Sequence, residues 1–202
     1  PDPAHIHKLV SGWNLGVCYR NRMLLKLTDR APLPWRLRPI DINRRVGSIN
    51  RVGKQEWYQF SRGKLLDEIE GLEKKFRMTG TGRASAKRYF LELGLSKITL
   101  SPFGWGEVCF RDYEAIACGS LLVKPEMTHL ETSPDIYIPG ETYVPIPWDF
   151  QGASEVCERY LRDPKASKRI IRNSRAVLRD YFKKDGFVRD IERTLGRVVE
   201  LD

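Results

Sequence analysis

One stretch near the middle of the chain, FGWGEVCFRDYEAIACGSLLV at 103–123, limits the folds that this sequence can adopt. It combines a glycine-bearing turn, a short amphipathic segment, a second tight turn and an apolar run at 121–123. This order predicts a loop, a helix and a buried strand in succession. Such a succession is typical of a parallel sheet in an α/β domain, where ligands bind beyond the carboxyl ends of the strands. We therefore expect a helix that begins between Gly106 and Arg111, followed by a buried parallel strand at 121–123.

The first half of the chain predicts a long extended segment, followed by a strand and two helices. Residues 1–39 are rich in Pro, Trp and Arg and are expected to form an extended segment. A strand is expected within DINRRVGSIN at 41–50. Helical spacing of apolar residues covers 57–76, and SAKRYFLELG predicts a helix with Ser85 as its N-cap and Gly94 as its stop.

The second half continues the alternation. A strand is expected at 97–101, and two short β segments are expected around the Pro-Gly turn within 135–147. Amphipathic spacing then predicts helices at 153–163, 164–182 and 187–198. Alternating strands and helices predict an α/β fold: a Rossmann-like parallel sheet with helices on both faces, ending in C-terminal helices.

The composition allows several kinds of partner. The 202 residues carry 35 Lys and Arg against 26 Asp and Glu, for a net charge of +9. This excess fits nucleic acid, an anionic membrane or a phosphate-bearing small molecule. No apolar run approaches the roughly 20 residues that span a bilayer. Cysteines are scattered without a CxxC spacing and are expected to be buried reduced thiols, which favours the cytoplasm: Cys18, Cys109, Cys118 and Cys157.

The residues around the predicted central helix suit a phosphate ligand. Gly104 and Gly106 would let a ligand approach the main chain, and the helix N-terminus would attract its phosphates. Arg111 and Glu114 are three residues apart and share a helix face. The arginine could neutralise a diphosphate, and the carboxylate could accept hydrogen bonds from ribose hydroxyls. The alternative is an ordinary exposed Arg–Glu pair.

RDYEAIACGSLLV, with the later YVPIPWDF and the helix that follows it, resembles the C-terminal half of a GT-B-fold glycosyltransferase of the group 1 type. In that family a glutamate before an EA-x-A-x-G turn binds the ribose of the nucleotide-sugar donor, and Glu114, Ala115, Ala117 and Gly119 match this pattern. Arg111 matches an arginine that precedes the glutamate in one branch. The likeness runs from about residue 41 to residue 201.

The chain also departs from the family pattern. The first of the two glutamates of many retaining members would fall at Gly106, one residue before Glu107. Glu107 and Arg111 are the catalytic candidates that the resemblance implies. Arg51 and Lys54 are its candidates for the diphosphate, although they lie closer together than the usual spacing.

The sequence therefore predicts the donor-binding half of a glycosyltransferase. Residues 1–40 would be a connecting or N-terminal-domain remnant, and residues 41–202 the Rossmann-like domain. The donor would be a nucleoside-diphosphate sugar, and a missing N-terminal domain would hold a glycan, lipid-linked or protein acceptor. No cofactor or metal is implied, because no Asp-x-Asp motif is present. A peripheral membrane contact stays open beside the cytoplasmic assignment, and no nucleic acid is expected.

Two alternatives to this function stay open. One is a basic nucleic-acid-binding module that uses the helix at 166–183, although the apolar residues of that helix are expected to pack inward: Ile170, Ile171, Val177, Leu178 and Tyr181. The other is a scaffold derived from a glycosyltransferase that no longer turns over. His129, after the strand at 121–123, is expected at the surface.

Overall fold

The computed structural model describes residues 21–46, 57–104 and 106–199. Within these ranges the strands form one four-stranded, wholly parallel sheet in the order β1-β2-β3-β4. Leu121 and Val123 pair with Ile98 and Leu100 and are fully buried, so the predicted buried strand is confirmed. The strands are β1 (Ile40–Asn43), β2 (Ser96–Leu100), β3 (Leu121–Pro125) and β4 (Val144–Ile146).

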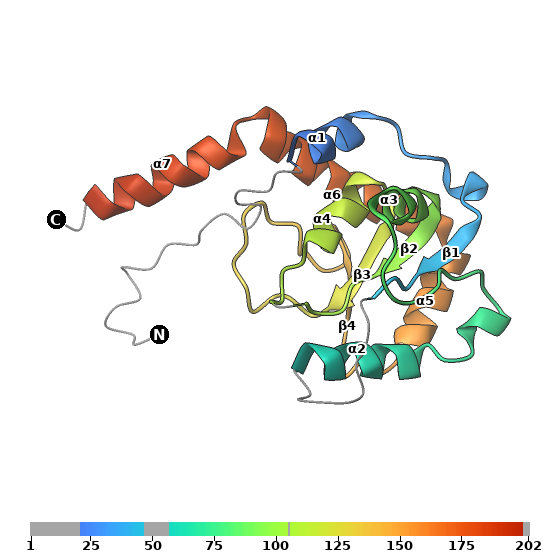
Figure 1. Cartoon of the computed structure of the whole chain (residues 1–202). Coiled ribbons are helices and arrows are strands. Elements are labelled where there is room, and N and C mark those ends of the chain that lie inside the picture. Colours follow the sequence, from blue (N-terminus) through green and yellow to red (C-terminus); the bar gives the residue numbers. More distant parts are fainter. Residues whose placement is uncertain (1–20, 47–56, 105, 200–202) are drawn as a thin grey trace.

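Helices cover both faces of this sheet (Figure 1), which confirms the predicted Rossmann-like architecture. One apolar cluster joins one face of the strands to α2 and α5, and a second joins α1 and α4 to the other face. The long α6 contributes to both clusters, while α7 extends away from the rest of the domain. The helices are α1 (Asn21–Asp29), η2 (Trp35–Leu37), α2 (Trp57–Glu68), η3 (Leu72–Lys74), α3 (Ala86–Leu95), α4 (Phe110–Ala117), α5 (Ala153–Arg162), α6 (Pro164–Lys183) and α7 (Gly186–Val199).

Local signals set several of the helix ends. Ser85 caps α3 by accepting a hydrogen bond from the backbone N–H of Arg88. Asp163 caps α6 with its carboxylate, and Pro164 occupies the first helical position, where no N–H is needed. The start of α4 at Phe110 lies inside the predicted interval. These boundaries follow the sequence because caps involve only neighbouring residues.

Other expectations need correction. The helix expected over 57–76 ends at Glu68, because Gly71 turns the chain with a φ of 87° before η3. Gly94 lies inside α3 rather than ending it. Only β4 forms from the two β segments expected within 135–147.

The segment before β1 is also more structured than expected. Residues 21–29 form α1 instead of an extended connection, and its Leu24 is buried against α4 and α6. The division of the chain at residue 40 stays a prediction. The packing of α6 agrees with expectation, since Ile170, Leu178 and Tyr181 are buried. No helix in the described ranges is both long and apolar enough to cross a membrane.

Candidate functional site

The loop between β2 and α4 lies at the carboxyl end of a central strand, where an open α/β sheet binds ligands. Gly104 is buried in this loop, and a Cβ added there would lie 3.2 Å from Cys109 Sγ. A side chain at this position would therefore crowd the loop. Gly106 is exposed and has open space around it. The loop before α4 is therefore too close for a side chain at Gly104 but not at Gly106.

Glu114 is the buried acid of this region. Its side chain is on α4, the residue is only 3% exposed, and Oε2 accepts a hydrogen bond of 2.7 Å from the Tyr89 hydroxyl. Burial and the neighbouring carboxylate raise the pKa of Tyr89, so the tyrosine keeps its proton and donates to Glu114. A carboxylate offers about four acceptor positions, so it can accept several hydrogen bonds at once. The alternative of an exposed Arg–Glu pair does not fit this burial.

A pocket of about 520 Å³ opens beside Glu114. Arg111 enters it from the first turn of α4, and the Nε atom of Arg111 is buried with no hydrogen-bond partner among the described residues. Arg62 of α2 adds a second cation, with Nη2 3.9 Å from a Cβ built at Gly104. Aromatic side chains of α3 and α4 complete the walls: Tyr89, Phe90 and Phe110. The pocket thus combines cations, a buried carboxylate and ring surfaces.

A buried polar network supports the start of α4 from below. The Asp112 carboxylate accepts hydrogen bonds from Ser101 Oγ at 2.5 Å, from the Tyr137 hydroxyl at 2.6 Å and from the Cys109 backbone N–H at 3.0 Å. Lys124 of β3 lies 3.1 Å from the same carboxylate, and both side chains are fully buried. This network ties the loop after β2 to α4 and β3, which fixes the geometry of the pocket wall.

A second cluster lies at the same end of the sheet. Glu107 Oε2 is 3.2 Å from His129 Nε2, and the His129 ring meets the Trp148 ring edge-on at 5.2 Å between centroids. Trp148 also packs edge-on against Phe103 and is 52% exposed. His129 is partly exposed, in line with the expected surface position.

The structure therefore brings together four of the predicted site residues: Gly104, Gly106, Arg111 and Glu114. Glu107 does not line this pocket and instead pairs with His129 beside it. Arg51 and Lys54 lie outside the described residues, so their assignment stays a prediction.

Arg62 and Tyr89 are among the pocket residues that were missed from the sequence. Helical spacing predicted the helices that carry them. It did not show that these two side chains meet α4.

The described residues offer no group of three His, Cys, Asp or Glu side chains that would hold a metal ion. Three cysteines lie in the described ranges, and all are free thiols. Burial raises the pKa of Cys118 and of Cys157 to about 12, so both remain neutral near pH 7. Neither thiol lines the pocket beside Glu114.

Comparison with solved structures decides the fold. The chain is similar to sucrose-phosphate synthase from Thermosynechococcus elongatus, with a TM-score of 0.52 and 17% sequence identity over 95% of this chain. The chain therefore shares its fold with part of that protein. It spans only about half of that protein, covering 52% of its length. No family model matches the sequence, and no curated protein matches it.

Proposed function

We propose that this chain is the donor-binding half of a glycosyltransferase that uses a nucleoside-diphosphate sugar. The buried carboxylate of Glu114, which lines a pocket at the carboxyl end of β2, carries this proposal. An acid buried in a cationic pocket suits a ligand that has both hydroxyl and phosphate groups. The glycosyltransferase-like fold supports the same class of enzyme.

The ribose of the donor binds at Glu114. The carboxylate accepts a hydrogen bond from Tyr89, which fixes its orientation, and the two ribose hydroxyls are proposed to donate to the same carboxylate. The exposed ring of Phe110 lies at the mouth of the same pocket, where a nucleobase can stack on it.

The diphosphate binds at the start of α4. Arg111 and Arg62 supply positive charge there. Arg51 and Lys54 are proposed as further phosphate contacts. Cations in fixed positions stabilise the negative charge that develops on the departing diphosphate, which is the main chemical contribution of this half of the enzyme.

The transferred sugar extends toward Glu107, which we propose as its contact. The pair of Glu107 with His129 holds the carboxylate beside the pocket. A second domain supplies the glycan, lipid-linked or protein acceptor. This chain acts in the cytoplasm and needs neither a metal ion nor a cofactor in this proposal.

Calorimetric titration with nucleoside diphosphates tests the ribose contact. The wild-type protein is expected to prefer a nucleoside diphosphate over its 2′,3′-dideoxy form, because the dideoxy form lacks the hydroxyls that donate to the buried Glu114 carboxylate. Glu114→Gln should shrink this preference. Glu73→Gln, an exposed acid outside the pocket, is the matched control and should leave it unchanged.

The phosphate contact has its own variant. Arg111→Ala should weaken nucleotide binding by about 1–3 kcal/mol, the range for charge-assisted hydrogen bonds, while the exposed Arg77→Ala should not. The site would be refuted if wild type and Glu114→Gln showed the same preference for the nucleoside diphosphate over its dideoxy form. Duplex DNA that binds more tightly than any nucleotide, with steep salt dependence, would instead support the nucleic-acid-binding module.

A further inference from the structure

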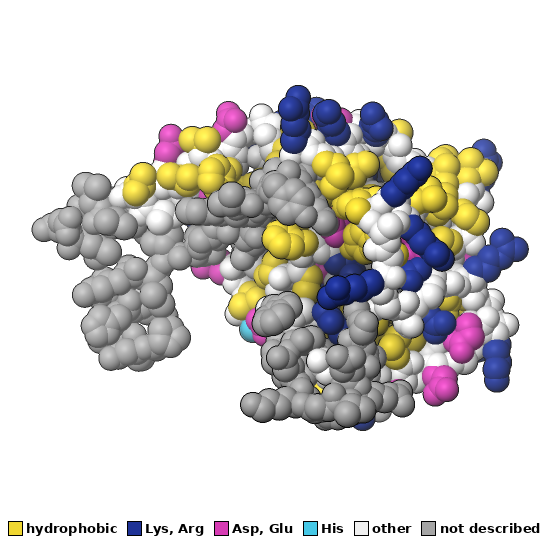
Figure 2. Space-filling model, viewed as in Figure 1, with side chains coloured by type: hydrophobic (Ala, Val, Ile, Leu, Met, Phe, Trp, Pro, Cys, Tyr) yellow, Lys and Arg dark blue, Asp and Glu magenta, His cyan; other side chains and the backbone are white. Residues whose placement is uncertain are grey.

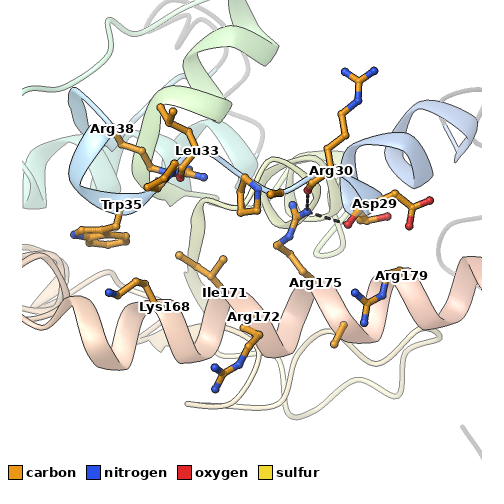
Figure 3. Close-up of a pocket in the computed structure, with 16 residues that line it drawn as sticks. Asp29, Arg30, Leu33, Trp35, Arg38, Lys168, Ile171, Arg172, Arg175 and Arg179 are labelled. Atoms are coloured by element: carbon orange, nitrogen blue, oxygen red, sulfur yellow. Dashed lines mark hydrogen bonds between the residues drawn. The ribbon is translucent and has the colours of Figure 1, made fainter.

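A second cavity of about 440 Å³ lies between the segment 28–38 and α6 (Figure 3). We call it the basic groove. It lies at the amino end of the sheet, because Arg38 on its wall donates to the Ser96 carbonyl at the start of β2. The pocket beside Glu114 lies beyond the opposite end of that strand. Six cations line the groove against one acid, Asp29: Arg30, Arg38, Lys168, Arg172, Arg175 and Arg179.

Two of these cations hold the groove together. Arg38 donates to the carbonyls of Leu33 and Cys118 as well as to that of Ser96. Arg175 donates to the Thr28 and Arg30 carbonyls, which fastens the segment to α6 (Figure 3). Burial lowers the pKa of Arg38 to about 10, which still leaves it charged at neutral pH. Arg38 and Arg175 are therefore held by hydrogen bonds within the protein.

The other four cations are exposed. Arg30 and Arg172 stand on opposite rims of the groove and point away from each other, and Lys168 points toward Trp35 (Figure 3). Asp29 pairs with Lys183 at 2.6 Å, so it does not neutralise these rims. Figure 2 shows Lys and Arg side chains gathered along the upper edge of the molecule, over α1 and the segment that follows it. The divergence of Arg30 and Arg172 suits an extended anionic surface better than one small anion.

Apolar side chains stand among these cations. Leu33 is 37% exposed on the groove wall, and Leu37 is 57% exposed on the adjoining η2. Trp35 lies between them and is half-buried. Exposed leucines beside a tryptophan and a ring of cations are typical of a surface that meets lipid headgroups, where apolar groups enter the interface and cations meet phosphates. Contact with the phosphate backbone of a nucleic acid would give the exposed leucines no role.

We propose that the basic groove docks this protein on an anionic lipid bilayer. Leu33 and Leu37 enter the headgroup region, while Arg30, Lys168 and Arg172 contact lipid phosphates. The surface lies at the opposite end of β2 from the pocket beside Glu114, so bilayer contact leaves that pocket open. The inference goes beyond the proposed glycosyltransferase activity and does not depend on it.

Co-sedimentation of the whole chain with vesicles tests the proposal. The protein is expected to bind phosphatidylcholine vesicles that contain phosphatidylserine, and not pure phosphatidylcholine. Each basic residue near an anionic surface adds about 1 kcal/mol, or about 5-fold in partitioning, so Lys168→Ala/Arg172→Ala should lose about 25-fold. Leu37→Ser should also weaken binding, because it removes the apolar contact.

The matched control is Arg83→Ala/Lys87→Ala. It removes two exposed cations near the carboxyl end of the sheet, beside and within the start of α3, and should bind like wild type. Thermal unfolding checks that every variant is folded, and all of the substitutions are at exposed positions. Failure of the wild type to bind anionic vesicles would overturn the proposal, as would an equal loss in the control. A nucleic-acid role would also overturn the proposal. In that case the protein would bind duplex DNA tightly, Lys168→Ala/Arg172→Ala would abolish this binding, and Leu37→Ser would change neither DNA binding nor vesicle binding.

Discussion

Asp112→Asn should destabilise the protein strongly while keeping the shape of the side chain. The wild-type carboxylate and Lys124 are 3.1 Å apart with both side chains fully buried. Asparagine removes the negative charge and leaves the ammonium of Lys124 buried without a counter-charge. Removing one partner of a buried pair costs about 3–5 kcal/mol. At about 2–4 °C per kcal/mol for a chain of this size, Tm should fall by about 6–20 °C.

A second substitution separates the charge from the packing. Adding Lys124→Met to Asp112→Asn removes the buried ammonium as well, and the double variant should recover much of the lost stability. Lys97→Met is the control, because Lys97 forms a partly exposed pair with Asp41 at 2.6 Å. Its cost should be about 1 kcal/mol or less.

Urea unfolding followed by circular dichroism measures these differences. The double-mutant cycle for Asp112 and Lys124 should give a coupling free energy that is large compared with the additivity error of about 0.5 kcal/mol. The reasoning is refuted if Asp112→Asn lies within about 1 kcal/mol of wild type, or if the two substitutions simply add.

Two further stability predictions follow from the same structure. Gly119 turns the chain into β3 with a φ of 71°, and an added Cβ would lie 2.5 Å from the Cβ of Pro32. Gly119→Ala should therefore lower the free energy of unfolding by at least about 1–2 kcal/mol. Gly94→Ala lies inside α3 with open space around it and should raise the free energy of unfolding by up to about 1 kcal/mol. Urea unfolding measures both changes. Burial raises the pKa of Cys157 to about 12, above its ordinary value near 9, so the native state keeps a proton that the unfolded chain loses. Its contribution to stability is complete below about pH 9 and falls by about 1.4 kcal/mol per pH unit as the pH rises toward 12. Cys157→Ala should show a shallower loss of unfolding free energy between pH 8 and pH 10.5 than wild type, and parallel curves would contradict this assignment.

Interactions between residues that are close in the sequence allowed much of the fold to be predicted. Ser85 and Pro164 mark helix starts through bonds that involve only the next few residues, and the apolar run at 121–123 predicts its own burial. The same local order placed Glu114 on a short helix directly before that strand. These predictions held because a cap, a turn and a strand face depend on neighbours along the chain.

Tertiary structure alone decided the rest. The sequence does not show that Tyr89, 25 residues away, donates to Glu114, or that Arg62 of α2 reaches the same pocket. It also does not show that Lys124 is buried against Asp112, because a lysine in a strand is ordinarily exposed. Such contacts depend on how the sheet brings distant helices together. Local sequence order was enough to predict most of the strands and helices, including the helix that carries the candidate acid, whereas the packing of those elements decided which charges are buried and which side chains line one pocket.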